Sequence, residues 1–102
     1  MSEIINQDDQ TIIRPGTDVV ASMTEAFKGE LLAAIDASDG QVIIDLKGVG
    51  MIDSVGVGVV IAAYNTLNQA GRKLKVLNLN KELYDLFTNI RLHRRFDVEE
   101  AV

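Results

Sequence analysis

Residues 48–60 read GVGMIDSVGVGVV, and the conformation of this stretch decides the fold of the chain. Taken alone, its valine-rich second half has the propensity of a strand. However, it is flanked by residues 42–46 (VIIDL) and 73–79 (KLKVLNL), which are short, apolar and typical of buried strands. Parallel strands are joined by a crossover of a dozen or more residues, which is usually helical. We therefore predict a helix over residues 54–70.

The predicted helix has one apolar face and two glycines near its start. Its second half, AAYNTLNQAG, contains good helix formers and ends on a glycine. Val60, Tyr64 and Leu67 recur at helical spacing, so we expect them to face the sheet. We also expect Gly56 and Gly58 to allow a close approach between this helix and its neighbours.

The N-terminal part of the chain predicts a hairpin followed by a helix. Residues 4–5 and 11–13 are short β-prone runs around a polar, turn-like segment, which indicates a β-hairpin. Ser22-Met-Thr-Glu25 then has the spacing of a capping box, so we expect a helix over residues 22–36. The residues expected on its apolar face are Met23, Phe27, Leu31, Ala34 and Ile35.

The C-terminal part predicts one more helix and an edge strand. The apolar face of this helix is expected to consist of Leu83, Leu86, Phe87 and Ile90. Residues 96–99 alternate between apolar and charged side chains, as in a short edge strand. The expected element order is therefore β-β-α-β-α-β-α-β. We predict one α/β domain over residues 1–102, with a mixed sheet of about four to five strands and three to four helices.

Composition and charge exclude several classes of function. The formal net charge is −5, whereas nucleic-acid binding needs a basic surface, so we expect no nucleic-acid partner. The chain contains no cysteine, which excludes disulfides and thiolate metal sites. The N-terminal MSEIINQDDQ is acidic and polar, unlike a signal peptide, and no apolar run is long enough to span a bilayer. We expect a cytoplasmic protein without membrane insertion.

The motifs of catalytic and cofactor sites are also missing. Neither glycine pair in residues 48–60 is followed by the third glycine of a dinucleotide-binding motif, which disfavours a nucleotide-binding sensor domain. The single histidine, His93, is far along the chain from Ser54 and is not expected to act as its base. Asp45 and Asp53 lack further residues that would complete a metal site. We expect no enzyme activity, no catalytic residue, no cofactor and no metal.

Two interpretations fit the polar pair Asp53-Ser54 within this apolar stretch. In the simpler one, Asp53 or Ser54 caps the predicted helix by accepting a hydrogen bond from a free backbone N–H group. In the other, Ser54 is an exposed phosphoacceptor at the helix N-terminus, where the helix dipole tolerates a phosphate dianion. The apolar neighbours would then form a protein-binding patch that a phosphate disrupts. The residue pattern alone favours capping, because capping requires nothing further.

Several motifs, in order and at matching spacing, resemble the STAS domain of anti-sigma factor antagonists over residues 42–98. These motifs are Asp45-Leu46, Asp53-Ser54-Val55-Gly56-Val57-Gly58, the segment from Gly71 to Val76, Leu86-Phe87, and Phe96 to Val98. Residues 1–40 match more loosely, because Gly16-Thr17-Asp18 lacks the leucine of the family pattern and its aspartate is displaced by one position. Val55 stands where the family usually has Ser, Thr or Ala, which leaves Ser54 as the only acceptor in the motif.

The resemblance implies a partner switch in bacterial transcription that is a substrate and ligand rather than an enzyme. The unphosphorylated domain would bind an anti-sigma factor that is also a serine kinase, phosphorylation of Ser54 would release it, and a serine phosphatase would reset the switch. The partner-binding residues implied are Asp53, Ser54, Val55, Gly56 and Val57. A weak homodimer is also allowed. The alternative is a STAS accessory subunit of a lipid-trafficking ABC transporter, or of another signalling complex, that works without phosphorylation.

Overall fold

The stretch that decides the fold is helical from Ser54 onward, as its flanking strands predicted. The computed structural model describes residues 2–102. In chain order its elements are β1 (Glu3–Gln7), β2 (Gln10–Arg14), α1 (Ser22–Asp36), β3 (Gln41–Asp45), α2 (Ser54–Gln69), β4 (Leu74–Leu79), α3 (Lys81–Asn89), a short 3₁₀ helix η1 (Leu92–Arg94) and β5 (Asp97–Glu100). The predicted α/β fold and element order are confirmed.

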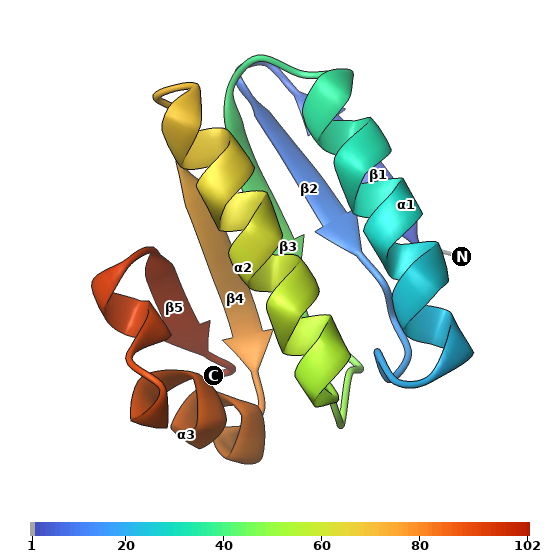
Figure 1. The fold of residues 1–102 in the computed structure, drawn as a ribbon, viewed down its shortest axis with the longest axis vertical. Helices are drawn as coiled ribbons and strands as arrows, with labels where there is room; N and C mark the ends of the chain where they lie inside the picture. The colour runs from blue at the N-terminus through green and yellow to red at the C-terminus, as the bar shows by residue number, and fades with distance from the viewer. Residues whose placement is uncertain (1) are drawn as a thin grey trace.

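The five strands lie in the sheet in the order in which they occur in the chain (Figure 1). β1 and β2 are antiparallel, with Ile5 opposite Ile12, so the predicted hairpin is confirmed. All other neighbouring strands are parallel. Crossovers of one hand that step in one direction place their helices on the same face of a sheet. Accordingly, α1 and α2 lie side by side over one face (Figure 1).

The core lies between that face of the sheet and the inward stripes of the helices. The largest fully buried side chains include Phe87, Ile13, Leu31, Ile44, Leu46, Leu67 and Leu79. From α2, Val60 and Leu67 are buried as predicted, whereas Tyr64 is only partly buried at the margin of the core.

The two glycines of α2 have different surroundings. A Cβ atom at Gly56 would lie 2.7 Å from Cγ2 of Ile52 and 3.0 Å from the backbone oxygen of Val19. A Cβ atom at Gly58 would have nothing within 4 Å. The predicted close approach is therefore right for Gly56 and wrong for Gly58. Two residues correspond to about 200° around a helix, which turns Gly58 toward solvent.

Helix α1 covers the predicted range, but its predicted capping box is wrong. Ser22 is the first helical residue, and the preceding N-cap residue, Ala21, has a φ of 52° and makes no side-chain capping bond. Met23 is 41 % exposed, and the polar Thr24 is buried in its place. The other four residues expected on the apolar face are buried. A side chain from another part of the chain supplies the missing cap, as described below.

Helix α3 buries only half of its expected apolar face. Leu83 and Phe87 are buried, whereas Leu86 and Ile90 are 37 % and 46 % exposed. This helix has nine residues and packs on β4 and β5 at the edge of the sheet. Because this contact is small, the two side chains of Leu83 and Phe87 are sufficient to fill it. Phe96 is buried immediately before β5, which confirms the predicted last edge strand.

Candidate functional site

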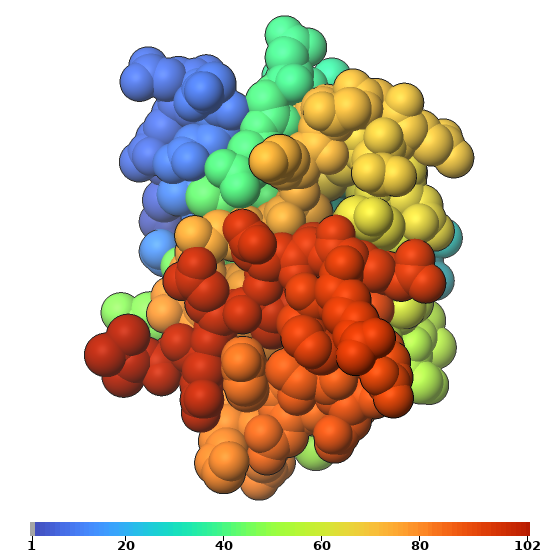
Figure 2. Space-filling view, turned by 90° about the vertical axis from the view of Figure 1, so that its left-hand side faces the viewer, coloured from blue at the N-terminus to red at the C-terminus, as the bar shows by residue number. Residues whose placement is uncertain are grey.

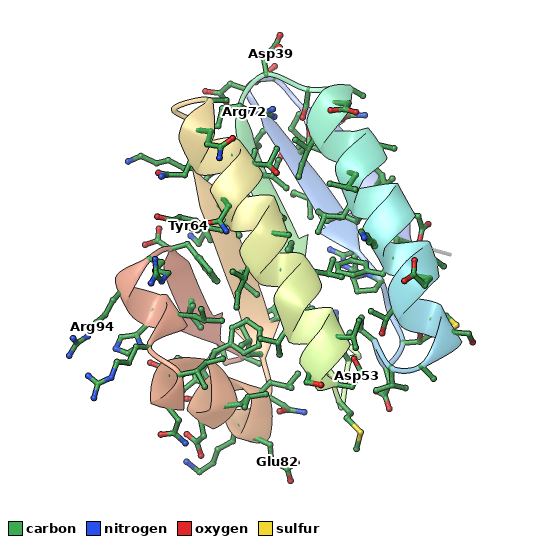
Figure 3. The ribbon with its side chains drawn as sticks, in the orientation of Figure 1. Asp39, Asp53, Tyr64, Arg72, Glu82 and Arg94 are labelled. Atoms are coloured by element: carbon green, nitrogen blue, oxygen red, sulfur yellow. The ribbon has the colours of Figure 1, made fainter. Side chains whose placement is uncertain are left out.

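The carboxylate of Asp53 caps two helices at once. Asp53 is the N-cap residue of α2, and its Oδ1 accepts a hydrogen bond of 2.7 Å from the N–H of Gly56. Its Oδ2 accepts a bond of 3.0 Å from the N–H of Ala21, at the start of α1. Figure 3 shows Asp53 at the beginning of α2, on the side that faces α1. The bonds from Gly56 and then from Ala21 lower the pKa of Asp53 below its ordinary value.

The side chain of Ser54, next to Asp53, does not cap the helix. Because Asp53 supplies the cap, the hydroxyl of Ser54 is not needed for it, and Ser54 is the exposed first residue of α2. The two apolar side chains nearest in sequence that face solvent are Met51, 58 % exposed, and Val55, 59 % exposed. The junction thus combines a serine hydroxyl with apolar surface at the N-terminus of a helix.

The structure separates the five residues for which partner contacts were predicted. Ser54 and Val55 are exposed. Asp53 is partly buried, and its carboxylate is occupied by the capping bonds. Gly56 is buried, and Val57 is partly buried and packs against the core. The exposed surface at this junction therefore comes from Ser54, Val55 and the preceding Met51, which the sequence interpretation did not assign to it.

Asp18 holds the loop before Ser54 from the other side. Its Oδ1 accepts hydrogen bonds from the N–H groups of Gly50, at 2.7 Å, and Met51, at 3.1 Å. The next residue, Val19, forms a parallel bridge with Ile52. The displaced aspartate of the Gly16-Thr17-Asp18 segment, whose role the sequence left open, thus positions the loop. Its partners are 32 and 33 residues away along the chain, so no local sequence pattern indicated these contacts.

The end of β3 anchors the first part of the same loop. Asp45 is 4 % exposed, and its carboxylate pairs with Arg14 at 2.9 Å. It also accepts hydrogen bonds from Nδ2 of Asn78, at 2.8 Å, and from the N–H of Lys47, at 3.0 Å. Burial alone raises the pKa of Asp45, but the bonds from Asn78, Lys47 and Arg14 outweigh it and keep the pKa below its ordinary value. Asp45 therefore ties β2, β3 and β4 together beneath the loop.

Neither Asp53 nor His93 is placed to act as a base for Ser54. The neighbouring carboxylate of Asp53 already accepts bonds from two backbone N–H groups, so it is poorly placed to take a proton from Ser54. His93 is exposed on η1, which directly precedes the edge strand β5, and is therefore not next to Ser54 at the start of α2. Among residues 2–102, no three His, Cys, Asp or Glu side chains are grouped so that they could hold a metal ion. No helix in that range is long and apolar enough to cross a membrane.

Comparison with known proteins gives one family and a set of related folds. The family model described as "STAS domain" matches residues 2–102. An anti-sigma-factor antagonist (STAS) domain protein from Planctomyces limnophilus aligns with a TM-score of 0.84 at 14 % identity, over 99 % of this chain and 91 % of that one. An anti-sigma factor antagonist from Mycobacterium paratuberculosis gives 0.80 at 19 % identity, over 97 % and 84 %. The anti-sigma factor antagonist SpoIIAA in its unphosphorylated form gives 0.76 at 16 % identity, over 100 % and 90 %.

Proposed function

Because this chain belongs to the STAS domain family, we propose that it is an anti-sigma factor antagonist controlled by phosphorylation of Ser54. In this proposal residues 1–102 act as one domain in the bacterial cytoplasm. The unphosphorylated form binds an anti-sigma factor that is a serine kinase, and the phosphorylated form releases it. A serine phosphatase restores the binding form. The chain itself carries no catalytic residue.

The observation that carries the proposal is the position of Ser54. Its hydroxyl lies at the exposed start of α2, and the capping role that would otherwise explain a polar residue here belongs to Asp53. Met51 and Val55, more than half exposed, provide apolar surface that a protein partner would cover. Similarity in fold to anti-sigma factor antagonists agrees with this function.

The phosphoryl transfer needs only access to the hydroxyl. Oγ of Ser54 attacks the γ-phosphorus of kinase-bound ATP, an Oγ–P bond forms, and the bond from that phosphorus to the bridging oxygen breaks and leaves ADP. A base on the kinase accepts the hydroxyl proton. The phosphatase later cleaves the Oγ–P bond with water and returns the proton to Oγ.

A phosphate at this position affects binding more than folding. The free N–H groups and positive dipole end of α2 favour a dianion at its first residue. By contrast, the phosphate places charge beside the apolar Met51 and Val55 and beside the carboxylate of Asp53. A partner that covers Met51 and Val55 would have to desolvate that charge, which weakens the complex.

The test is to incubate the protein with its candidate kinase and ATP and to locate the phosphate by mass spectrometry. Ser22 is a matched control, because it is also the exposed first residue of a helix. We expect phosphate on Ser54, none in Ser54→Ala, and unchanged labelling in Ser22→Ala. Ser54→Ala should change the free energy of unfolding by no more than about 0.5 kcal/mol, since Asp53 remains as the cap.

Binding of the same partner separates the switch from its alternative. Ser54→Ala should retain affinity, whereas Ser54→Glu should weaken binding at least about tenfold, because it places an unpaired charge in the interface. Equal affinity for both variants, or phosphate on a different residue, would contradict the switch. Those outcomes would favour a constitutive subunit of a transporter or of another signalling complex.

A further inference from the structure

A cavity of about 270 Å³ opens on an edge of the molecule distant from Ser54. It lies between the C-terminal half of α2, the start of β4, and the junction of η1 with β5. Tyr64, on its wall, is ten residues beyond Ser54, or about 15 Å along the helix. Figure 2 faces this edge and shows the end of α2 and the start of β4 above the residues of η1 and β5.

The lining of the cavity is basic although the chain is acidic. Lys73 and Arg95 contribute two exposed cations and Asp97 contributes one carboxylate, while Arg72 lines the cavity with its guanidinium hydrogen-bonded to residues 35–40. The ion pairs found among residues 2–102 involve other cations, so none of them neutralises Arg72, Lys73 or Arg95. On a protein with a formal net charge of −5, this local excess of positive charge favours an anionic ligand.

Arg72 is held rigidly without being neutralised. Its Nε donates to the backbone oxygen of Gly40 at 2.9 Å, its Nη1 to that of Ile35 at 3.0 Å, and its Nη2 to Oγ of Ser38 at 2.8 Å. These three acceptors lie at the C-terminal end of α1 and just before β3, so the guanidinium is fixed on that side and the cations that face a ligand are Lys73 and Arg95.

Aromatic side chains form the other part of the wall. The ring centroids of Tyr64 and Phe96 are 5.6 Å apart, with the planes inclined at 42°. Phe96 is buried, whereas Tyr64 is partly exposed, so the tyrosine ring offers a face or edge to a ligand. Figure 3 shows Tyr64 on the side of α2 that faces the Arg94 segment.

We infer that this cavity binds a small phosphate monoester carried on a planar ring. Lysine and arginine together suit a phosphate, one as a compact charge and the other as a directional donor. The partly exposed ring of Tyr64 suits the planar group. The cavity is slightly smaller than those that hold drug-sized molecules, which favours a small ligand over a polymer.

The experiment is an amide chemical-shift titration of the intact protein with three probes: phenyl phosphate, inorganic phosphate and phenol. The test variant is Lys73→Gln/Arg95→Gln, whose two side chains are exposed. The control variant, Lys28→Gln/Lys81→Gln, removes the same charge from exposed positions on α1 and α3. A third variant, Tyr64→Leu, removes the ring and keeps an apolar side chain.

We expect phenyl phosphate to shift the amides of residues 72–74 and 95–97 to saturation. It should bind about tenfold more tightly than inorganic phosphate, and Tyr64→Leu should remove that advantage. Lys73→Gln/Arg95→Gln should weaken binding about tenfold and the control variant should not.

Three outcomes would overturn the inference. Equal weakening in the test and control variants would indicate an adventitious ion only. Equal affinity for phenyl phosphate and inorganic phosphate would show that a planar ring contributes nothing to binding, so the proposed ligand would be wrong. Saturable binding of anionic vesicles or of single-stranded DNA, lost in Lys73→Gln/Arg95→Gln while phenyl phosphate causes no shift, would identify a macromolecular docking surface instead.

Discussion

Replacing each of the two glycines of α2 by alanine should have opposite consequences. At Gly58 the new methyl group meets nothing within 4 Å, so only backbone effects remain, and alanine in a helix interior is favoured over glycine by about 1 kcal/mol. At Gly56 the same gain is opposed by contacts at 2.7 Å with Ile52 and at 3.0 Å with the backbone oxygen of Val19. Overpacking of this kind costs about 1–3 kcal/mol.

The contact with Val19 should make relaxation at Gly56 difficult. The backbone oxygen of Val19 accepts a hydrogen bond of 3.2 Å from the N–H of Asp53, so it cannot move without disturbing the cap that joins α1 to α2. We therefore expect Gly58→Ala to be more stable than the parent by about 1 kcal/mol. Gly56→Ala should be less stable than Gly58→Ala by about 1–3 kcal/mol.

Urea unfolding followed by circular dichroism measures both variants against the parent under one set of conditions. Equal stabilities for Gly56→Ala and Gly58→Ala would refute the reasoning, because helix propensity would then account for both positions. A stabilised Gly56→Ala would likewise show that Ile52 and Val19 yield without cost.

Three further predictions concern the core and the loop anchors. Leu67→Ala should lower the free energy of unfolding by about 2–5 kcal/mol in urea, whereas Leu32→Ala, at a 39 % exposed position, should cost much less. The pKa of Asp45 is lowered on folding, so the stability it contributes is present above the unfolded-state pKa and is lost as the pH falls through the folded-state value. The stability difference between the parent and Asp45→Asn should therefore shrink on acidification in urea titrations at several pH values; a constant difference would contradict this. Asp18→Ala should speed hydrogen exchange at the amides of Gly50 and Met51, and Asp18→Asn, which keeps an acceptor oxygen, should preserve more of the protection.

Local patterns were sufficient for the kinds of elements and their order. The runs at 42–46 and 73–79 are largely apolar, and the segment between them is too long for a hairpin turn, so chain connectivity favours a crossover between parallel strands. Propensity by itself would have assigned a strand to residues 55–61, and the flanking strands overrode it. The position of Ser54 at the start of that helix was likewise predictable, because it depends on neighbours in sequence.

The sequence alone therefore determined an α/β chain with a helix beginning at Ser54, because periodicity, β-branching and connectivity act over neighbouring residues. Only the tertiary structure decided that Asp53 caps α1 as well as α2, through Ala21, which is 32 residues away. Only the tertiary structure likewise turned Gly56 inward and Gly58 outward. These features depend on which elements come into contact and on which side of each helix faces its neighbours. That is settled by the packing of the whole sheet and its helices, a property that no short stretch of sequence contains.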